Sequence, residues 1–400
     1  MRIIYLHQYF HTPAVAGSIR SYEMARRFVS WGHEVHLITS DREANRGAYQ
    51  TEEAGIQVHW LPVPYSNMLS TYGRIRAFFQ FAWGAARKAA ALEGDLVFAT
   101  STPLTIALPA VYAAKRKRVP MVFEVRDLWP ELPVAMGTLK GWPLITAARW
   151  LERFAYRNSA QIVALSPGMK EGVVRAGYPA ERVAVIPNSA DLALFDVPAS
   201  KGAEFRAKYP WLGDRPLVLY AGTLGTINGV EYLARLAAAL KERAPEVRFL
   251  VIGHGPDEEK IRNLARELGV LDHNFFMIPK VPKADMPAVL SATTVATSLF
   301  IDLEEMWVNS ANKFFDALAS GTPVAINYGG WQAELLKESG AGIVLDPHDT
   351  EGSAQRLWEK LSDEVWLEQA GKNSRKLAET NFSRDELAKQ LETVLLRANA

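Results

Sequence analysis

The chain has 400 residues, of which 48% are hydrophobic and 22% are charged, a composition typical of a folded protein with room for two hydrophobic cores. Cysteine is absent, which excludes disulfide bonds, a thiolate nucleophile and a zinc site that uses cysteine. No stretch approaches the roughly 20 consecutive apolar residues of a membrane-spanning helix, so we expect a cytoplasmic protein that does not cross a membrane.

The net charge of +1 conceals an asymmetry between the two halves of the chain. Residues 1–195 contain 22 Lys and Arg against 15 Asp and Glu, whereas residues 196–400 contain 23 against 29. A basic half indicates contact with something anionic. Chance variation of the surface is the alternative.

In the first half, short apolar runs alternate with stretches whose apolar residues recur at helical spacing. Residues 1–6 form the first run, which is too short for a signal peptide and typical of a buried strand. Residues 18–31 follow as an amphipathic helix that ends at Gly32. Further strands are expected at residues 34–39, 57–62, 95–99, 121–125 and 161–165.

The same alternation restarts near residue 216. Strands are expected at residues 216–220, 247–252, 274–278, 295–298, 323–326 and 342–345, with a clear helix at 230–243. Strands that alternate with helices predict a parallel, doubly wound sheet in each half. The predicted fold class is therefore α/β, with Rossmann-like domains at 1–195 and 196–400 and a last helix near 383–400 that packs back on the first domain. In such folds ligands bind at the carboxyl ends of the strands.

Several glycines follow predicted strands. Gly17, Gly222 and Gly225 precede predicted helices, where backbone N–H groups and the lack of a side chain favour a bound phosphate. Neither the loop with Gly17 nor the loop with Gly222 and Gly225 has the glycine spacing of dinucleotide-binding folds or the lysine of a P-loop. Ordinary turn glycines are therefore the alternative. Gly253 and Gly255 follow the next strand and bring bare backbone to the sheet edge, where a flat base has room to lie.

Asn309 opens a segment that reads as a polar turn, a helix, a glycine stop and a buried strand. Ser310 or Asn312 is suited to cap this helix. Lys313 and Asp316 lie one turn apart on one helix face, where the ammonium would meet a phosphate and the carboxylate a ribose diol. An ion pair between the two at the protein surface is the alternative.

The pattern Ser-x-Asn-Lys-x-x-Asp-x-x-Ala-x-Gly-x-Pro-Val, from Ser310 to Val324, resembles the donor-binding region of glycosyltransferase family four. The resemblance extends over nearly the whole chain and implies a retaining glycosyltransferase with the two-domain GT-B fold. The details Asp127-Leu128-Trp129-Pro130-Glu131 and Trp331-Gln332 look most like bacterial enzymes of surface-polysaccharide assembly (O-antigen or capsule). These include N-acetyl-L-fucosamine transferases.

The resemblance also implies roles in binding the nucleotide sugar. Asp316 stands where the family has the second glutamate of its E-x7-E motif, which binds the ribose, whereas Val308 replaces the first, which contacts the sugar. The arginine and lysine that clamp the diphosphate in the family fall on Thr223 and Asn228, so Lys313 is the best remaining cation. Glu304, Glu305 or Asn309 are the neighbours that would replace the lost sugar contact. The predicted donor-binding residues are Gly17, Gly222, Thr223, Gly225, Asn228, Gly253, Gly255, Asn309, Ser310, Asn312, Lys313, Asp316, Gly330 and Trp331.

On the acceptor side, the histidine that the family commonly aims at the donor falls on Arg126, and arginine cannot act as a base because its pKa stays above about 12. Asp127 is our first candidate to orient or deprotonate the acceptor, and Glu124 is the second. The alternative for Asp127 is a helix N-cap before Leu128. The segment Asp302-Leu303-Glu304 lacks the context of a metal-binding D-x-D motif, and the histidines show no ligand spacing, so we expect no metal and no cofactor beyond the substrate.

Two basic segments lie in the first half. Residues 74–83 open a helix that mixes arginine with phenylalanine and tryptophan and continues through Arg87 and Lys88, and residues 115–118 are all basic. Basic residues beside aromatic ones are typical of elements that lie on anionic lipid. The alternative is that the aromatic residues belong to the core and the second segment is a solvated loop.

Together these observations predict retaining transfer from a nucleotide diphosphate sugar, with UDP-N-acetyl-L-fucosamine as one candidate, to a lipid-linked or saccharide hydroxyl in surface-polysaccharide biosynthesis. The enzyme is expected at the inner face of the cell membrane as a peripheral protein, without nucleic acid as a partner. A UDP-sugar 2-epimerase of the same architecture and a non-catalytic sugar-nucleotide-binding scaffold are the alternatives.

Overall fold

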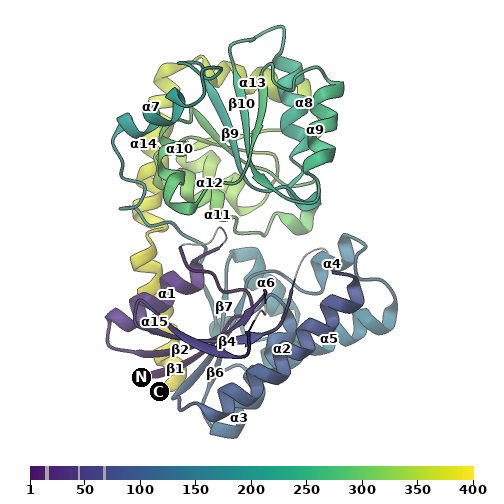
Figure 1. The fold of residues 1–400 in the computed structure, drawn as a ribbon, viewed down its shortest axis with the longest axis vertical. Helices are drawn as coiled ribbons and strands as arrows, with labels where there is room; N and C mark the ends of the chain where they lie inside the picture. The colour runs from purple at the N-terminus through teal and green to yellow at the C-terminus, as the bar shows by residue number, and fades with distance from the viewer. Residues whose placement is uncertain (14–17, 44–45, 66–68) are drawn as a thin grey trace. The chain divides into compact units, whose positions relative to one another are not determined.

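The computed structural model describes residues 1–13, 18–43, 46–65 and 69–400. Contacts divide the chain into two compact units (Figure 1). The first unit consists almost entirely of the described part of residues 1–187 and of Asp385–Ala400. The second unit consists mainly of Asn188–Arg384. The predicted boundary between residues 195 and 196 therefore lies too late, because the chain changes unit between Pro187 and Asn188.

The first unit contains a sheet with the strand order β3-β4-β2-β1-β5-β6-β7-β8. Its central strands are almost completely buried, as expected of parallel strands covered on both faces. The strands are β1 (Arg2–Leu6), β2 (Glu34–Asp41), β3 (Tyr49–Glu53), β4 (Ile56–Pro62), β5 (Leu96–Thr100), β6 (Met121–Val125), β7 (Gln161–Ala164) and β8 (Val183–Val185).

Two of these strands were not predicted. β3 is polar, lies at the edge of the sheet and pairs antiparallel with β4, so it lacks the apolar run that marks a buried strand. β8 is short and lies at the opposite edge. The remaining strands of this unit agree with the predicted ranges to within one or two residues at each end.

Helices cover both faces of this sheet. α1 (Arg20–Ser30) and α15 (Arg384–Asn399) pack on one face, where Phe28, Leu391 and Leu395 share a core with strand residues. α2 (Thr71–Ala91), α3 (Ala107–Lys117) and α5 (Trp142–Arg157) lie together on the other (Figure 1), and α3 contacts both of its neighbours. The shorter helices are η1 (Leu104–Ile106), α4 (Glu131–Ala135), α6 (Pro167–Arg175) and η2 (Ala180–Arg182). None of the helices in the described ranges is both long and apolar enough to span a bilayer.

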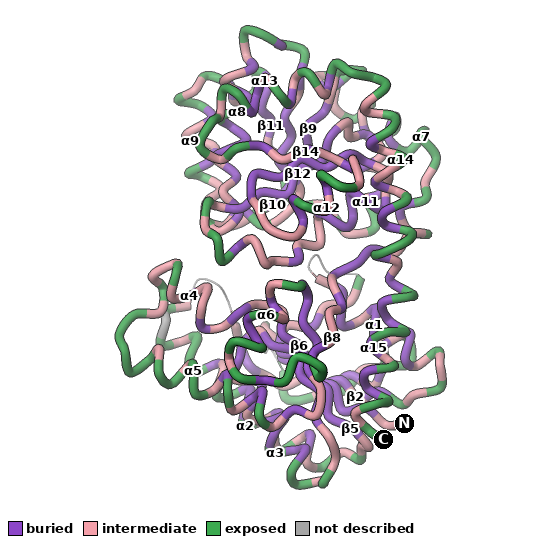
Figure 2. The backbone as a smooth tube through the Cα atoms, turned by 180° about the vertical axis from the view of Figure 1, so that it is seen from behind, coloured by how far each residue is buried: buried purple, intermediate pink, exposed green. Residues whose placement is uncertain are grey.

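The second unit contains a parallel sheet with the order β11-β10-β9-β12-β13-β14. Its strands are β9 (Leu217–Thr223), β10 (Arg248–His254), β11 (Phe275–Ile278), β12 (Val295–Ser298), β13 (Val324–Ile326) and β14 (Gly342–Val344), which match the predicted ranges closely. Figure 2 shows the strands as buried backbone in the middle of each unit.

The helices of the second unit again form two layers. α8 (Glu231–Leu240), α9 (Glu258–Glu267) and α13 (Thr350–Leu361) share one core with the sheet. The other helices are α7 (Ala199–Ala207), η3 (Thr226–Asn228), η4 (Lys283–Asp285), α10 (Met286–Ser291), η5 (Glu304–Met306), α11 (Asn312–Ala319), α12 (Trp331–Ser339) and α14 (Glu364–Asn381). Two doubly wound α/β units are therefore established.

Glu152 on α5 introduces a pH dependence into the first unit. Its side chain is buried, and burial followed by the nearby Glu131 carboxylate raises its pKa from 4.5 to about 7. Between these values the folded state binds the extra proton, so the free energy of unfolding falls as the pH rises through this window. The expected loss is on the order of 3 kcal/mol.

We expect Glu152→Gln to remove this loss. In urea denaturation, the variant should gain stability relative to the wild type as the pH rises from 5 to 8. If the difference in free energy of unfolding between the variant and the wild type stayed constant from pH 5 to 8, Glu152 would not be the source of the pH dependence.

Candidate functional site

The carboxyl edge of the second sheet has a switch point between β9 and β12, because the chain runs outwards from β9 in one direction and from β12 in the other. Such points are where open α/β sheets bind ligands. Gly222 is the second-last residue of β9 and pairs with Gly253 of β10. A Cβ on Gly253 would lie 2.0 Å from the carbonyl oxygen of Gly222, and one on Gly255 would lie 2.2 Å from that of Leu224. Close backbone packing therefore requires both glycines, whatever ligand they meet.

Lys313 stands at this switch point, in the first turn of α11. Its ammonium donates a hydrogen bond to Asn228 Oδ1 at 3.2 Å and lies over the rings of Tyr220 and Phe300, 4.8 and 5.6 Å from their centroids. No carboxylate of the described residues forms an ion pair with it. Burial lowers its pKa to about 8. Lys313 is thus a cation held by neutral groups.

The lysine lies directly beside the end of β9. A Cβ on Gly222 would come within 3.0 Å of Lys313 Cε, so the absence of a side chain keeps this approach open. The Tyr220 hydroxyl donates to the Thr223 carbonyl at 2.8 Å and fixes the following turn. The structure therefore brings together three of the residues predicted to bind the donor, namely Gly222, Asn228 and Lys313. Thr223 and Gly225 belong to the same loop.

Asp316 lies elsewhere on α11. Its buried carboxylate is ion-paired with Lys283, whose ammonium also lies 5.2 Å from the centroid of the Phe195 ring. The alternative of an ion pair between Lys313 and Asp316 is therefore wrong. Lys283 was missed because it lies far from Asp316 in the sequence, outside any recognisable pattern.

The polar turn before α11 has a structural role. The N-cap residue of α11 is Ala311 without a side-chain cap, so the prediction that Ser310 or Asn312 caps the helix is wrong. Ser310 Oγ instead accepts a hydrogen bond from the backbone N–H of Asn188 at 3.0 Å. The Asn309 carbonyl accepts one from Trp331 Nε1 at 3.0 Å.

Trp331 and Gly330 belong to the packing around this turn. The Trp331 ring packs against Phe315 and Phe382. Gly330 has φ of +80°, and a Cβ there would lie 2.7 Å from the Trp307 carbonyl oxygen. These contacts account for both residues without a ligand. Glu304 and Glu305 are exposed.

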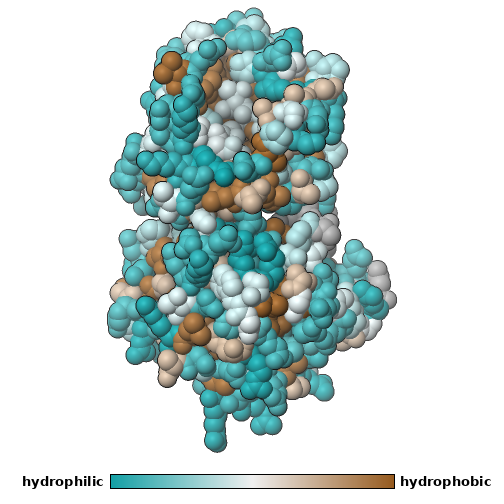
Figure 3. Space-filling view, turned by 90° about the vertical axis from the view of Figure 1, so that its left-hand side faces the viewer, coloured by the Kyte–Doolittle hydropathy of each residue, from teal (hydrophilic) through white to brown (hydrophobic). Residues whose placement is uncertain are grey.

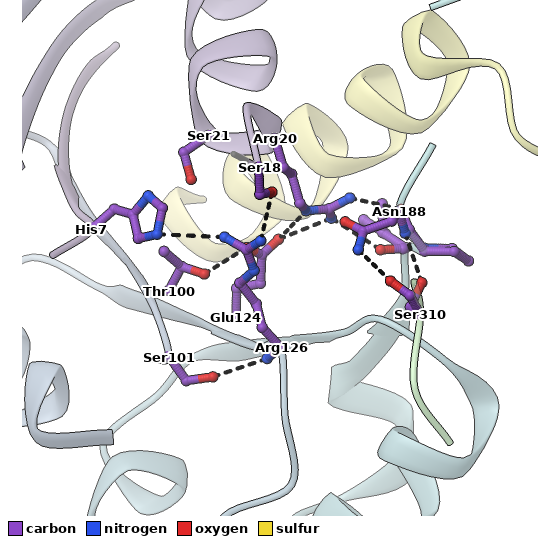
Figure 4. Close-up of polar contacts among 12 residues, drawn as sticks. His7, Ser18, Arg20, Ser21, Thr100, Ser101, Glu124, Arg126, Asn188 and Ser310 are labelled. Carbon is purple, nitrogen blue, oxygen red and sulfur yellow. Dashed lines mark hydrogen bonds and ion pairs between the residues drawn. The ribbon is translucent and has the colours of Figure 1, made fainter. Parts of the chain in front are cut away.

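In the first unit, Glu124 is the second-last residue of β6, and its buried side chain belongs to a network of polar contacts (Figure 4). Its Oε1 accepts hydrogen bonds from Arg20 at 2.9 and 3.0 Å, and its Oε2 accepts one from Thr100 at 2.7 Å. The neighbouring guanidinium of Arg20 holds the pKa of Glu124 below its usual value, against the effect of burial. Both oxygens are thus occupied, which favours a positioning role over proton transfer.

Arg126 follows Glu124 and carries its guanidinium towards β1 and α1 (Figure 4). Its Nη2 donates to Ser18 Oγ at 2.9 Å, and its Nη1 lies 3.4 Å from His7 Nε2. Its backbone N–H donates to Ser101 Oγ at 2.9 Å. The side chain is held in place by neutral partners.

Asp127 is oriented by Thr102, whose hydroxyl donates to Oδ2 at 3.2 Å. Burial raises the pKa of Asp127, with Arg126 and Thr102 opposing that effect. The N-cap alternative is wrong, because α4 begins only at Glu131 and has Pro130 as its N-cap. The structure therefore brings Glu124, Arg126 and Asp127 together at the end of β6.

Gly17 lies outside the described residues. Within the described ranges, no group of three or more His, Asp or Glu residues is arranged to hold a metal ion.

Residues 17–189 match the model of the glycosyl transferase 4-like domain, and residues 202–377 match that of glycosyl transferases group 1. The chain is 24% identical over 288 residues to the GDP-mannose-dependent alpha-(1-6)-phosphatidylinositol monomannoside mannosyltransferase of Mycolicibacterium smegmatis, covering 65% of this chain and 74% of that protein. It is 22% identical over 284 residues to the putative colanic acid biosynthesis glycosyl transferase WcaI of Escherichia coli strain K12, covering 67% and 69%.

Solved structures resemble the whole chain. Sucrose-phosphate synthase from Thermosynechococcus elongatus superposes with a TM-score of 0.80 at 18% identity, covering 99% of this chain and 98% of that one. HepE of Anabaena, solved with UDP-glucose, superposes with a TM-score of 0.75 at 17% identity, covering 99% and 100%.

The fold of the two units is therefore GT-B, as the sequence predicted. The chain belongs with the glycosyltransferases: it is an enzyme that joins a glycosyl transferase 4-like domain to a group 1 domain, a class that uses nucleotide-sugar donors.

Proposed function

We propose that this enzyme transfers a sugar, with retention of configuration, from a UDP-sugar to a hydroxyl of a lipid-linked or saccharide acceptor in surface-polysaccharide biosynthesis. The observation that carries the proposal is the ammonium of Lys313, which lacks an anionic partner among the described residues at the switch point of the second sheet. The complex of HepE with UDP-glucose supports UDP as the nucleotide.

A donor diphosphate would supply the anion that Lys313 lacks. In a partly dry site an ammonium attracts a phosphate far more strongly than in water, and the N–H groups of the Gly222–Gly225 loop add hydrogen bonds to it. Asp316 is proposed to accept the ribose hydroxyls through Oδ1, because Lys283 holds Oδ2. Val308 offers no carboxylate to the donor sugar, and UDP-N-acetyl-L-fucosamine is our candidate donor.

Asp127 is proposed to orient the acceptor hydroxyl. Its raised pKa makes it a better proton acceptor than an ordinary aspartate. In a same-face substitution the leaving phosphate itself takes up the acceptor proton, so Asp127 then contributes by position. This assigns proton uptake to the donor diphosphate and alignment to Asp127.

A lipid-linked acceptor requires access to a membrane surface. Four large residues of α2, Tyr72, Ile75, Phe79 and Trp83, are 43–77% exposed and recur at helical spacing. Exposed arginines lie among them, and α5 adds exposed Trp142, Leu144 and Trp150. By contrast, the side that carries α1 and α15 is mostly hydrophilic (Figure 3). The named substrate of the mycobacterial relative is itself a lipid.

We therefore propose that α2 lies on anionic lipid at the inner face of the cell membrane. The alternative that its aromatic residues are core holds for Phe81, which is 1% exposed, but not for Phe79.

Burying two large aromatic side chains contributes roughly 3 kcal/mol or more. We expect Phe79→Ser with Trp83→Ser to weaken sedimentation with anionic vesicles at least about tenfold. Leu396→Ser, on α15, is the matched control, and equal binding of all three proteins would refute the contact.

The transfer reaction itself tests the function. Nucleotide sugars screened by thermal shift should show stabilisation by a UDP-sugar, because a true donor stabilises by mass action. That donor, incubated with a membrane lipid extract, should yield UDP and a glycosylated lipid whose anomeric configuration matches the donor. Stabilisation by GDP-sugars alone would overturn the choice of nucleotide, and UDP release without an acceptor would favour an epimerase.

A further inference from the structure

We propose that Arg42 and Arg126 form a phosphate-binding subsite in the N-terminal domain, apart from the lysine of the donor site. This inference rests on the proposed function, in which the donor carries a diphosphate and a lipid-linked acceptor would carry a phosphate or diphosphate as its link to the lipid. The subsite lies where β1 and β2 end, beside the switch point between β1 and β5 of the first sheet.

Arg126 has a positive charge that its contacts do not neutralise. Its guanidinium meets a hydroxyl and an imidazole, and no carboxylate of the described residues lies within ion-pair distance. Glu124 is close enough for Arg126 to lower its pKa, yet its two oxygens are bound to Arg20 and Thr100. The guanidinium therefore keeps donors for an anion.

Arg42 likewise has a positive charge that its contacts with the described residues do not neutralise. It follows β2, its Nη2 lies 2.9 Å from His11 Nε2, and its guanidinium lies over the ring of Tyr9 at 5.0 Å. No carboxylate of the described chain pairs with it, and burial lowers its pKa. A half-buried guanidinium with only neutral partners is unfavourable unless an anion joins it.

The guanidiniums of Arg42 and Arg126 both lie close enough to His7 and His11 to affect their pKa values. Both lower the pKa of His7 and of His11, after the larger effect of burial, so both imidazoles are neutral near pH 7. The histidines therefore serve as acceptors that hold the arginines without competing for an anion.

Unpartnered donors at the same loop give independent support. Because His7 Nε2 faces Arg126, the ring proton sits on Nδ1, which is buried and has no acceptor among the described residues. The neighbouring Gln8 is fully buried, and neither atom of its side-chain amide has a partner there. Buried polar atoms are normally satisfied, so a ligand that supplies oxygen acceptors would complete this loop.

Two planar guanidiniums with a buried N–H donor match the oxygens of a phosphate or diphosphate. Two sources carry this group in the proposed reaction, namely a lipid-linked acceptor and the nucleotide donor. The arginines would fix the diphosphate, and thereby the distance of the reacting hydroxyl from Asp127.

The test uses the full chain with Lys313→Ala, which removes the proposed donor cation. Farnesyl diphosphate and inorganic diphosphate are titrated into this protein by calorimetry, before and after adding Arg42→Gln or Arg126→Gln. Each change should weaken binding at least about tenfold, since a charged hydrogen bond is lost. Arg182→Gln, an exposed residue of η2, is the matched control and should leave binding unchanged.

Titration of UDP into Arg42→Gln and Arg126→Gln with Lys313 intact identifies the source. Unchanged UDP affinity assigns the subsite to the acceptor, and weakened UDP affinity assigns it to the donor diphosphate. The inference is overturned if both diphosphates bind equally well to all variants, or fail to bind before the arginines are changed. A loss of UDP binding on Lys313→Ala is a separate result that bears on the donor site alone, so the two failures are distinguishable.

Discussion

Replacing Lys313 by methionine is expected to make the ligand-free protein more stable while destroying donor binding. The ammonium is partly buried beside Tyr220, Phe300 and Asn228, and this burial lowers its pKa from 10.5 to about 8. The unfolded chain keeps its proton up to about 10.5, so below pH 8 the folded state carries the full cost of a buried charge. That cost is on the order of 3 kcal/mol, reduced by the contacts to the two rings.

The pH dependence identifies the cause of this gain. Between pH 8 and 10.5 the unfolded chain binds more protons than the folded one, so the wild type gains stability as the pH rises. The advantage of Lys313→Met should therefore be largest at pH 7 and vanish near pH 10.5, when melting temperatures are compared. A variant that is less stable at pH 7 would show that the ammonium already has a favourable partner.

Removing the Glu124 carboxylate is expected to cost about 3–5 kcal/mol, because Glu124→Ala leaves the guanidinium of Arg20 buried without its counter-charge. The side chains of Arg20 and Glu124 are 3% and 0% exposed. Arg20 also donates to the carbonyls of Ile186 and Pro187 and so links α1 to the end of the first unit. Urea denaturation of the variant measures the loss.

A double-mutant cycle separates a structural role of Glu124 from a catalytic one. The double variant with Arg20→Met and Glu124→Leu should lose much less stability than these two substitutions lose in sum when each is made alone, because no unpaired charge remains. If Glu124→Ala instead kept full stability and lost only transfer, Glu124 would act on the substrate and its assignment as a positioning residue would be wrong.

The sequence was sufficient for most of the fold because parallel strands buried on both faces are continuous apolar runs. β1, β6 and β12 were therefore found almost to the residue. β3 escaped because its side chains are polar and half exposed, and its place is set by pairing with β4. The unit boundary was placed too late because it was read from the irregular residues that follow Phe195, whereas Asn188 already binds Ser310 of the second unit.

The candidate site was less predictable, because its contacts join residues far apart in the chain. Local spacing identified Lys313 and Asp316 as site residues and left an ion pair between them as the alternative. It did not show that Lys283 pairs with the carboxylate of Asp316 or that Asn228 accepts from the ammonium of Lys313. Likewise, Ser310 was read as a helix cap and instead binds Asn188. Partners contributed by distant loops leave no pattern that a single sequence reveals.

The proposed donor site depends most on Lys313, the cation for the donor diphosphate, and calorimetric titration of UDP tests this role directly. We expect binding to the wild type, loss of at least about 100-fold in Lys313→Ala, a smaller loss in Asp316→Ala, and no change in Lys376→Ala, which alters an exposed lysine of α14. Affinity should also fall as the pH rises past about 8, the pKa of the lysine. Equal UDP affinity in the wild type, Lys313→Ala and Asp316→Ala would contradict the proposed donor site.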